Sequence, residues 1–527
     1  MNPKARRPAR RVPAAAVTVL TVALLAACGT TVPRSQRQAA LSGAGAGGSD
    51  LGVPAGYVGA ADPTTAAPAA ASGAASTTVP TDAGAVTPGP QRPETATTGA
   101  SSAGVTTGRG ATGAAHSSAP ASHTPSSAAL ATANVPAGPI KVGMTYLDAG
   151  ATNAVTGGIG KGLTGADYYA ETQAYAADIN VHGGVLGRPI KMVFHQASTT
   201  GSEQEAGQGA CAAETQDEHV IVSFDQNYGG VVFPCLAKAH VATINTVMDG
   251  HSDQDYARYP LVLEPDSISL ERLAPIEVNL LAGAGYKPVG PQKLGVLYYD
   301  SDSYTRGFQA LKTAWAAQGV QIADAVSFHQ FNTVSDIAGL LAAVQGAELK
   351  FRSEGITHVM CVEANAFLCG EMGVYASSQK YYPRYAYTSA QALGNVLVNV
   401  PARGLEGSLF VGWAPSDDLN NVAAMPPRIQ ACLTFMTKHG FPIDTNNERD
   451  GATAICEQFE YLIASLKASG VPTADGIIAG ARKLGSSYVS SRTLKVGPRA
   501  DGVAQVRLGA YADSCACFTY TGPPVTP

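Results

Sequence analysis

The stretch INVHGGVLGRPIKMV, residues 179–193, connects the end of an expected helix to the start of an expected strand. Gly183 and Gly184 end the helix in backbone conformations that a β-carbon would resist. Gly187 then turns the chain, and an apolar run begins at Ile190. These glycines predict a short helix-to-strand connection, the repeating unit of folds in which helices and strands alternate.

The alternation of strand and helix extends in both directions from this stretch. PIKVGMTYLD precedes it and is expected to form a strand, followed by a helix at 163–180. The later segments are helix 202–217, strand HVIVSF, helix 229–239 and strand HVATINT. Continuous apolar strands between helices are typical of parallel strands that are buried on both faces and joined by right-handed crossovers. The pattern predicts a doubly wound α/β lobe.

A second series of the same kind follows and ends in two long helices and short closing strands. Its expected elements are helix 268–283, strand KLGVLYYD, helix 304–318, strand IADAVSFH, helix 334–349, strand THVMCVE, helix 366–379, strand RYAYTS, strand LEGSLFVGW and helices 426–438 and 450–469. The folded part, which begins at Pro139, is too long for one hydrophobic core and suits two lobes.

The N-terminus carries a cationic stretch and then an apolar run over residues 12–27. That run is shorter than the ~20 residues that a membrane-spanning helix needs, so residues 1–27 are expected to be a signal peptide. A short membrane anchor helix is the alternative. Leu25-Ala26-Ala27-Cys28 resembles the lipobox of bacterial lipoproteins. The resemblance implies acylation of Cys28, which would hold the mature chain on the outer face of a cell membrane.

Residues 28–138 consist almost entirely of Ala, Gly, Ser, Thr and Pro. They offer too little large apolar surface to offset the entropy of folding, so we expect a lipid-anchored disordered tether, with a glycosylated stalk as a weaker possibility. The formal net charge of the whole chain is -5. This charge gives no basic footprint for nucleic acid.

The opening stretch resembles the N-x-x-G-G-V-x-G-R-x-I segment of type 1 periplasmic binding proteins, the Leu/Ile/Val-binding family. LGVLYYDSDSYTRGFQAL resembles the second-lobe strand of that family followed by D-x-x-Y-x-x-G, with Ser301 at the acidic position. LEGSLFVGW resembles the strand by which the chain returns to the first lobe. The resemblance covers about residues 139–520.

This resemblance implies two doubly wound parallel-sheet lobes joined by three crossings, near Glu264, Gly407 and Lys495. Lobe 1 would comprise 139–263 with 409–495, and lobe 2 would comprise 264–408 with 496–527. A ligand would bind in the cleft between the lobes, outside the carboxyl ends of the strands, and the lobes would close around it by a hinge motion.

Binding proteins of this family hold small solutes with loops that follow strands. The corresponding candidates here are Tyr146, Asn227, Tyr228, Asn245 and Thr246 from lobe 1, and Tyr304, Glu363 and Ser389 from lobe 2. Tyr304 would stack on the solute and Glu363 would pair an ammonium group. The alternatives are a half-buried aromatic residue at a helix start and a solvated loop carboxylate. Asp225 stands where amino-acid binders usually have Ser or Thr, so a branched-chain amino acid is not assigned.

Eight cysteines remain after Cys28, and export to an oxidising compartment favours disulfides. Cys211 and Cys235 lie on successive expected helices, where the family often has a bridge. Three further pairs are expected, two from their positions and the last by elimination: Cys432 with Cys456, Cys361 with Cys369, and Cys515 with Cys517.

We therefore expect an extracytoplasmic solute-binding lipoprotein that delivers an amino acid or related compound to the permease of an ABC importer. A sensor or adhesion module that presents ligand on the same fold is the first alternative, and a secreted α/β enzyme is the second. Gly160, Gly162 and Gly165 have the dinucleotide spacing, but they begin well after the strand, which disfavours a cofactor loop. We expect neither catalysis nor a cofactor nor a metal.

Overall fold

The computed structural model describes residues 138–147, 165–197, 202–224, 229–246, 250–330, 336–364, 366–418 and 425–527. Cys28, nearly all of the expected tether, Asn227 and Tyr228 lie outside these ranges. All described residues belong to one compact unit of the chain. None of the helices within them has the length and hydrophobicity to cross a bilayer.

The first sheet has five parallel strands in the order β2-β1-β3-β4-β5. Its strands are β1 (Ile140–Leu147), β2 (Ile190–Ala197), β3 (Val222–Phe224), β4 (Ala242–Ile244) and β5 (Val262–Leu263). β1 pairs with β2 along its whole length, from Ile140↔Ile190 to Leu147↔Ala197. Val142, Met144 and Thr145 of β1 are buried, so residues on both faces of this strand are covered, as the continuous apolar run predicts.

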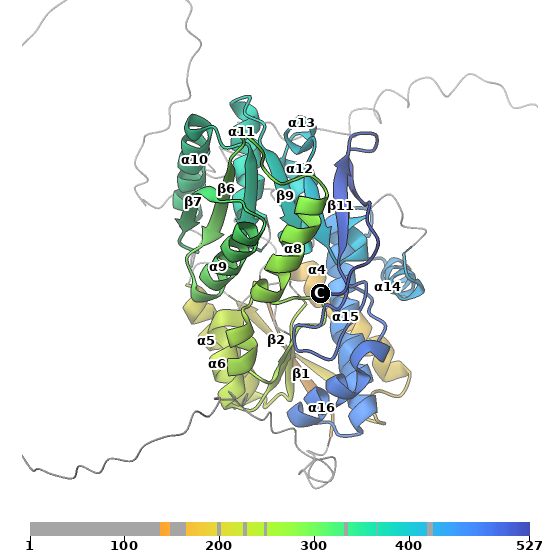
Figure 1. Ribbon diagram of the computed structural model, residues 1–527. Helices are drawn as coiled ribbons and strands as arrows, with labels where there is room; N and C mark the ends of the chain where they lie inside the picture. Colours follow the sequence, from red (N-terminus) through yellow and green to blue (C-terminus); the bar gives the residue numbers. More distant parts are fainter. Residues whose placement is uncertain are drawn as a thin grey trace, which may run out of the picture. The chain divides into compact units, whose positions relative to one another are not determined.

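The helices of this lobe come from distant parts of the sequence. They are α4 (Gly165–Val181), α5 (Glu203–Ala212), α6 (Gly229–Lys238), α7 (Asp253–Arg258), α14 (Pro427–Lys438), α15 (Asn446–Ser469) and α16 (Ala474–Leu484), with a short π-helix, η1 (Ala213–Asp217), after α5. In Figure 1 the blue helices α15 and α16 lie with the strands β1 and β2 of the same lobe. Phe459 and Leu462 of α15 share a core with Val142 and Val222 of the sheet.

The stretch at 179–193 forms the predicted connection between α4 and β2. Gly183, Gly184 and Gly187 have positive φ values of 95°, 71° and 72°. A β-carbon on Gly184 would come within 2.1 Å of the Arg188 carbonyl oxygen, which excludes any other residue there. The Asn180 side chain fixes the start of β2, since its Nδ2 donates to the Ile190 carbonyl at 2.8 Å and its Oδ1 accepts the Ile190 N–H at 2.7 Å.

The second sheet has seven strands in the order β12-β11-β10-β9-β8-β6-β7. The parallel strands are β6 (Leu294–Tyr299), β7 (Ile322–Phe328), β8 (His358–Val362), β9 (Arg384–Thr388) and β10 (Leu409–Gly412). β11 (Arg507–Ala512) and β12 (Cys517–Tyr520) extend it as an antiparallel hairpin. Its helices are α8 (Leu270–Gly283), α9 (Asp302–Ala317), α10 (Asp336–Glu354), α11 (Phe367–Ser378), α12 (Leu393–Asn399) and α13 (Ala402–Leu405). The predicted α/β class with parallel sheets is confirmed, with an antiparallel edge added.

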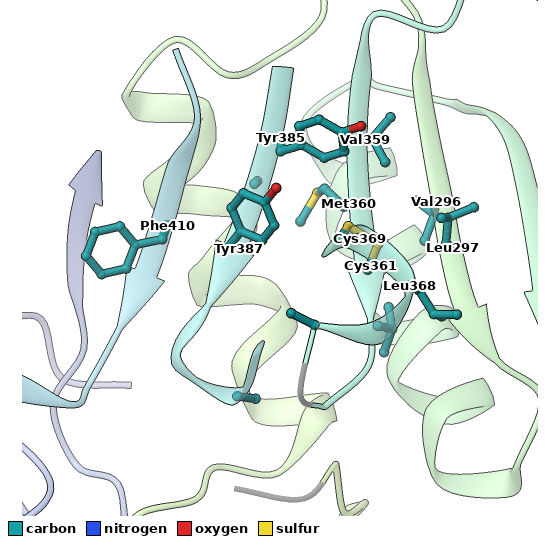
Figure 2. Packing of buried hydrophobic residues seen from close by; sticks show 14 of the residues in the cluster. Val296, Leu297, Val359, Met360, Cys361, Leu368, Cys369, Tyr385, Tyr387 and Phe410 are labelled. Atoms are coloured by element: carbon teal, nitrogen blue, oxygen red, sulfur yellow. A yellow bond between two sulfur atoms is a disulfide. The ribbon is translucent and has the colours of Figure 1, made fainter. Parts of the chain in front are cut away.

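The core of this lobe contains aromatic side chains that are fully buried. Tyr385 and Tyr387 extend from β9 beside Val359 of β8, and Figure 2 shows them close to the Cys361–Cys369 disulfide. Both tyrosine rings are 0% exposed, and their centroids lie 5.7 Å apart. Such closely packed rings give the lobe a core of its own.

One expected lobe boundary differs from the structure. The expected lobe 1 includes β10 from Leu409 onward, but Leu409 pairs with Ala386 of β9 and with Ala510 of β11 in the second sheet. The crossing therefore follows β10 instead of preceding it near Gly407. β10 pairs with the edge of β9 that β8 leaves open. The chain leaves the sheet after β10, at Trp413.

The three crossings lie side by side. Glu264, in the first crossing, forms two backbone hydrogen bonds with the third crossing. Its N–H donates to the Ala500 carbonyl at 2.8 Å, and its carbonyl accepts the Gly502 N–H at 2.7 Å. The second crossing contains Trp413, whose Nε1 donates to the Asp266 carbonyl at 2.6 Å and whose own carbonyl accepts the Leu494 N–H at 2.8 Å. These bonds join the crossings into one small hinge.

The structure pairs the eight cysteines between 211 and 517 in the four expected combinations. Their Cα–Cα distances are 6.2 Å for Cys211–Cys235, 5.8 Å for Cys361–Cys369, 6.1 Å for Cys432–Cys456 and 5.2 Å for Cys515–Cys517. These distances fall within the range that disulfide geometry allows.

Candidate functional site

The described candidate residues lie where parallel strands end. Tyr146 is the penultimate residue of β1, Asn245 and Thr246 follow β4, and Tyr304 lies in the first turn of α9 after β6. Glu363 follows β8 and Ser389 follows β9. The carboxyl ends of parallel strands are the edge at which α/β folds bind ligands, so the position of these six agrees with the expectation.

Tyr304 is buried between the two lobes. It is 6% exposed, and its hydroxyl accepts a hydrogen bond from the Gly250 N–H, with the nitrogen and oxygen 3.3 Å apart. A β-carbon on Gly250 would lie 2.3 Å from the tyrosine ring. Next to it, the Ser303 hydroxyl donates to Asp255 of α7 at 2.6 Å. The expectation of an open cleft surface at Tyr304 is therefore replaced by a direct contact with the β4–β5 connection.

Asn245 belongs to a hydrogen-bond network around Glu264. The Glu264 side chain is 0% exposed; its Oε1 lies 2.7 Å from Asn245 Nδ2 and 2.9 Å from His251 Nδ1. The Tyr256 hydroxyl donates to the other oxygen. Burial raises the pKa of Tyr256, and the neighbouring Glu264 adds to that shift. This network ties the end of β4 and α7 to the first crossing.

Thr246 connects the same strand end to α15. Its hydroxyl donates to the Ala454 carbonyl at 3.2 Å, and the residue is 0% exposed. The side chain thus fixes the end of β4 against a helix from the C-terminal part of the chain.

Glu363 binds the beginning of α11. Its carboxylate accepts the N–H groups of Leu368 and Cys369 at 2.5 and 2.8 Å and lies 3.3 Å from Gln391 Nε2. Burial raises the pKa of Glu363 to about 7, against the lowering effect of these donors. The carboxylate thus satisfies helix-end amides, and its exposure of 3% excludes the alternative of a solvated loop carboxylate. Cys361 and Cys369 lie near it, but their sulfurs form a disulfide and are not thiolate ligands.

Ser389 joins β9 to the second crossing. Its hydroxyl donates to Asp417 Oδ2 at 2.5 Å and accepts the Trp413 N–H at 2.8 Å. Asp417 also accepts the Tyr520 hydroxyl at 3.2 Å. Burial raises the pKa of Asp417 to about 7. Ser389 and Glu363 are both buried, with their side chains bonded within lobe 2 or to the hinge.

Sequence reasoning missed an arginine at the centre of the hinge. Arg492, in the third crossing, is 4% exposed and bonds Asp266 of the first crossing through Nε at 2.5 Å. It also holds both carboxylate oxygens of Asp450 on α15, at 3.0 and 3.1 Å. Burial raises the pKa of Asp266 to about 7, while the Arg492 guanidinium opposes the shift. Asp266, three residues after the end of β5, was the available signal; its partner is 226 positions away.

Three buried polar atoms of the first crossing make no hydrogen bond within the structure. They are Asp266 Oδ1, Ser267 Oγ and Ser269 Oγ. Buried polar atoms are normally paired with protein or water. Within the described part of the hinge, these atoms are suited to bind a small polar partner.

A separate group of aromatic side chains lies at the β1–β2 edge of the first sheet, whose opposite edge is β5, the strand that leads into the hinge. The Tyr146 ring lies 5.3 Å from the Tyr169 ring of α4 and 6.1 Å from the Phe194 ring of β2, and Tyr169 and Phe194 are 4.3 Å apart. All three side chains are half-buried. Half-buried rings at a strand end can pack against an apolar or aromatic group.

No protein-family model matches this chain, and no curated protein matches it by sequence. Solved structures match it in fold over almost their whole length. A substrate-binding protein of an ABC transporter from Desulfitobacterium hafniense, in complex with leucine, is 17% identical, with a TM-score of 0.51 over 73% of this chain and 100% of its own.

Two further structures extend the comparison. A solute-binding protein of an ABC transporter from Rhodopseudomonas palustris, in complex with p-hydroxybenzoic acid, is 15% identical, with a TM-score of 0.53 over 74% of this chain and 97% of its own. A leucine-binding protein from Thermotoga maritima is 13% identical, with a TM-score of 0.52 over 74% and 99%. At these identities the likeness is one of fold.

Proposed function

We propose that this chain, whose fold is that of the type 1 periplasmic binding proteins, captures a small solute between its two lobes and delivers it to the permease of an ABC importer. The observation that carries the proposal is the hinge. Three crossings lie together beside the carboxyl ends of the parallel strands of the two sheets, the arrangement that allows two lobes to close on a ligand.

The proposed solute is an amino acid or a related small organic acid. The half-buried rings of Tyr146, Tyr169 and Phe194 would pack against its apolar part. Ser267 and Ser269 would donate to its polar end, and Asp266 Oδ1 would accept from it. The compared proteins were solved with leucine and with p-hydroxybenzoic acid, solutes that combine a carboxyl group with an apolar body.

The proposal includes an anchor at the N-terminus. Leu25-Ala26-Ala27-Cys28 supports acylation of Cys28 on the extracytoplasmic face of the cell membrane, and the composition of residues 28–138 supports a tether between the lipid and the lobes. That tether, which is longer than an importer requires, also favours a second candidate: a sensor or adhesion module that presents the bound ligand to a receptor.

A thermal-shift screen of the purified chain against amino acids, amides, short peptides and aromatic acids tests the capture of a solute. Ligand at 100 times its dissociation constant stabilises a protein by about 2.7 kcal/mol. We expect at least one class to raise the Tm and to be recovered unchanged. Chemical conversion of the hit would favour an enzyme, and a bound solute that no partner permease accepts would favour the sensor.

A further inference from the structure

The Cys515–Cys517 bridge differs from the other three disulfides in exposure. Cys515 is exposed, in the turn between β11 and β12, and Cys517 is 6% exposed. The members of the other three pairs are buried, except Cys235, which is half-buried. A dissolved thiol therefore has a direct approach to the sulfur of Cys515.

The bridge also contributes little to holding the chain together. It joins residues only two positions apart, whereas the other bridges span 8, 24 and 24 positions. A bridge that closes so short a loop constrains the unfolded chain least. Ala516 between the two cysteines has a φ of 50°, a conformation that residues with a β-carbon rarely adopt.

The hairpin is held by other contacts when the bridge is open. Four residue pairs join β11 to β12, from Gly509↔Tyr520 to Ala512↔Cys517. Phe518 is 0% exposed and packs against the rings of Tyr387 and Phe410, at 5.8 and 5.4 Å. The strands therefore stay paired without the disulfide.

We propose that Cys515–Cys517 is a thiol-exchange site, at which a neutral or cationic thiol opens the bridge reversibly while the protein stays folded. The incoming thiolate forms a bond to Cys515 Sγ, and the bond between the two cysteine sulfurs breaks. The electron pair leaves on Cys517 Sγ, which takes a proton from water. When the reagent is a dithiol, its second thiol attacks the reagent sulfur that is bonded to Cys515. A disulfide forms within the reagent, and Cys515 is released as a thiol.

The charge around the turn selects the partner. Asp513 lies two residues before Cys515 and is exposed. The Asp513 carboxylate repels an anionic thiol and attracts a cationic one, an effect that salt screens. The site is thus suited to neutral dithiols and to thiols that carry an amine.

The test is graded reduction of the native full chain with dithiothreitol, followed by alkylation and peptide mapping. We expect Cys515 and Cys517 to become alkylated about tenfold faster or more than any other pair, with an unchanged circular dichroism spectrum. The Cys211–Cys235 bridge, in which Cys211 is buried and Cys235 is half-buried, is the internal control. Equal rates for the two bridges, resistance of Cys515–Cys517 until the protein unfolds, or free thiols at these positions before reduction would each overturn the proposal.

Two variants sharpen the experiment. Replacing both cysteines, Cys515→Ser with Cys517→Ser, should remove the fast phase and leave the slower phases unchanged. For the charge, the ratio of the exchange rates with cysteamine and mercaptoacetate should fall about twofold or more in Asp513→Asn and in 1 M salt. If neither Asp513→Asn nor 1 M salt changes the ratio of the two exchange rates, the proposed preference for neutral and cationic thiols is refuted.

Discussion

Among single residues, Glu277 illustrates most simply what burial does to a carboxyl group. It lies on α8 at 7% exposure, among buried neighbours such as Leu273, Ala274 and Val278. Burial alone raises its pKa from 4.5 to about 8. The folded protein therefore keeps this proton at neutral pH, whereas the unfolded chain releases it.

The pKa of Glu277 predicts a pH dependence of stability. A carboxyl group whose pKa is raised by folding stabilises the folded protein fully when the pH is below its pKa in the unfolded chain. This stabilisation is lost as the pH rises through its pKa in the folded protein. Between pH 4.5 and about 8 the free energy of unfolding should therefore fall. In Glu277→Gln this fall should be smaller by about 2–4 kcal/mol in urea titrations at pH 5 and pH 8. Identical pH profiles for the variant and the wild type would contradict the assignment.

The residue roles were less predictable than the residue positions. Glu363, Asn245 and Ser389 were expected at strand ends from the sequence, and they lie there. A carboxylate after a strand serves equally to bind an ammonium group or to satisfy helix amides, and the choice at Glu363 depends on where α11 begins. Arg492 was missed because its partners Asp266 and Asp450 meet it only in the folded chain.

Among the elements, the first turn of α9 and the β4–β5 connection form the contact that bears most directly on the site. Tyr304→Ala removes a buried ring that lies against Gly250 and Tyr299, so we expect a loss of about 3–5 kcal/mol in the free energy of unfolding. Because the ring joins the first turn of α9 to the β4–β5 connection of the other lobe, we also expect solute binding between the lobes to weaken about 5- to 150-fold by calorimetry.

Tyr304→Phe is the matched control for that variant. It keeps the ring and removes the hydroxyl that accepts the Gly250 N–H, so it should cost only about 0.5–1.5 kcal/mol. If Tyr304→Ala melts and binds as the wild type does, the contact between the lobes is assigned incorrectly.

The bridge between α14 and α15 should be structural. Cys432 and Cys456 are 2% and 0% exposed and 24 positions apart. Replacing both, Cys432→Ser with Cys456→Ser, should cost about 2–4 kcal/mol in urea unfolding. The same double replacement at Cys515 and Cys517 should cost less than about half as much, because the loop is shorter. Equal losses would show that loop length does not govern these bridges.

The element order was predictable because each apolar strand run alternates with a helix, and the glycines at 183, 184 and 187 fix one connection outright. The placement of β10 was not predictable in the same way. Its sequence fits either sheet, and the edges of β9 and β11 that receive it are formed by residues distant in the chain. Pairing partners of a buried strand depend on the whole sheet.

For the whole molecule, membrane attachment is the first prediction. Cys28→Ser removes the proposed acylation site and should move the protein from the detergent phase to the aqueous phase in detergent partitioning. Cys515→Ser, which keeps Cys28, is the control and should partition as the wild type does. Equal partitioning of Cys28→Ser and the wild type into detergent would refute acylation at this position.

The central claim is that a small solute binds between the two lobes, at the carboxyl ends of their strands. A crystal structure of the chain with the solute identified by the thermal-shift screen tests this most directly. We predict density for the solute in contact with the Asp266–Ser269 crossing and with residues of both lobes. A solute seated instead in the surface groove of roughly 860 Å³ between α8 and α9, lined by Pro275, Arg306 and Ala310, would contradict the account.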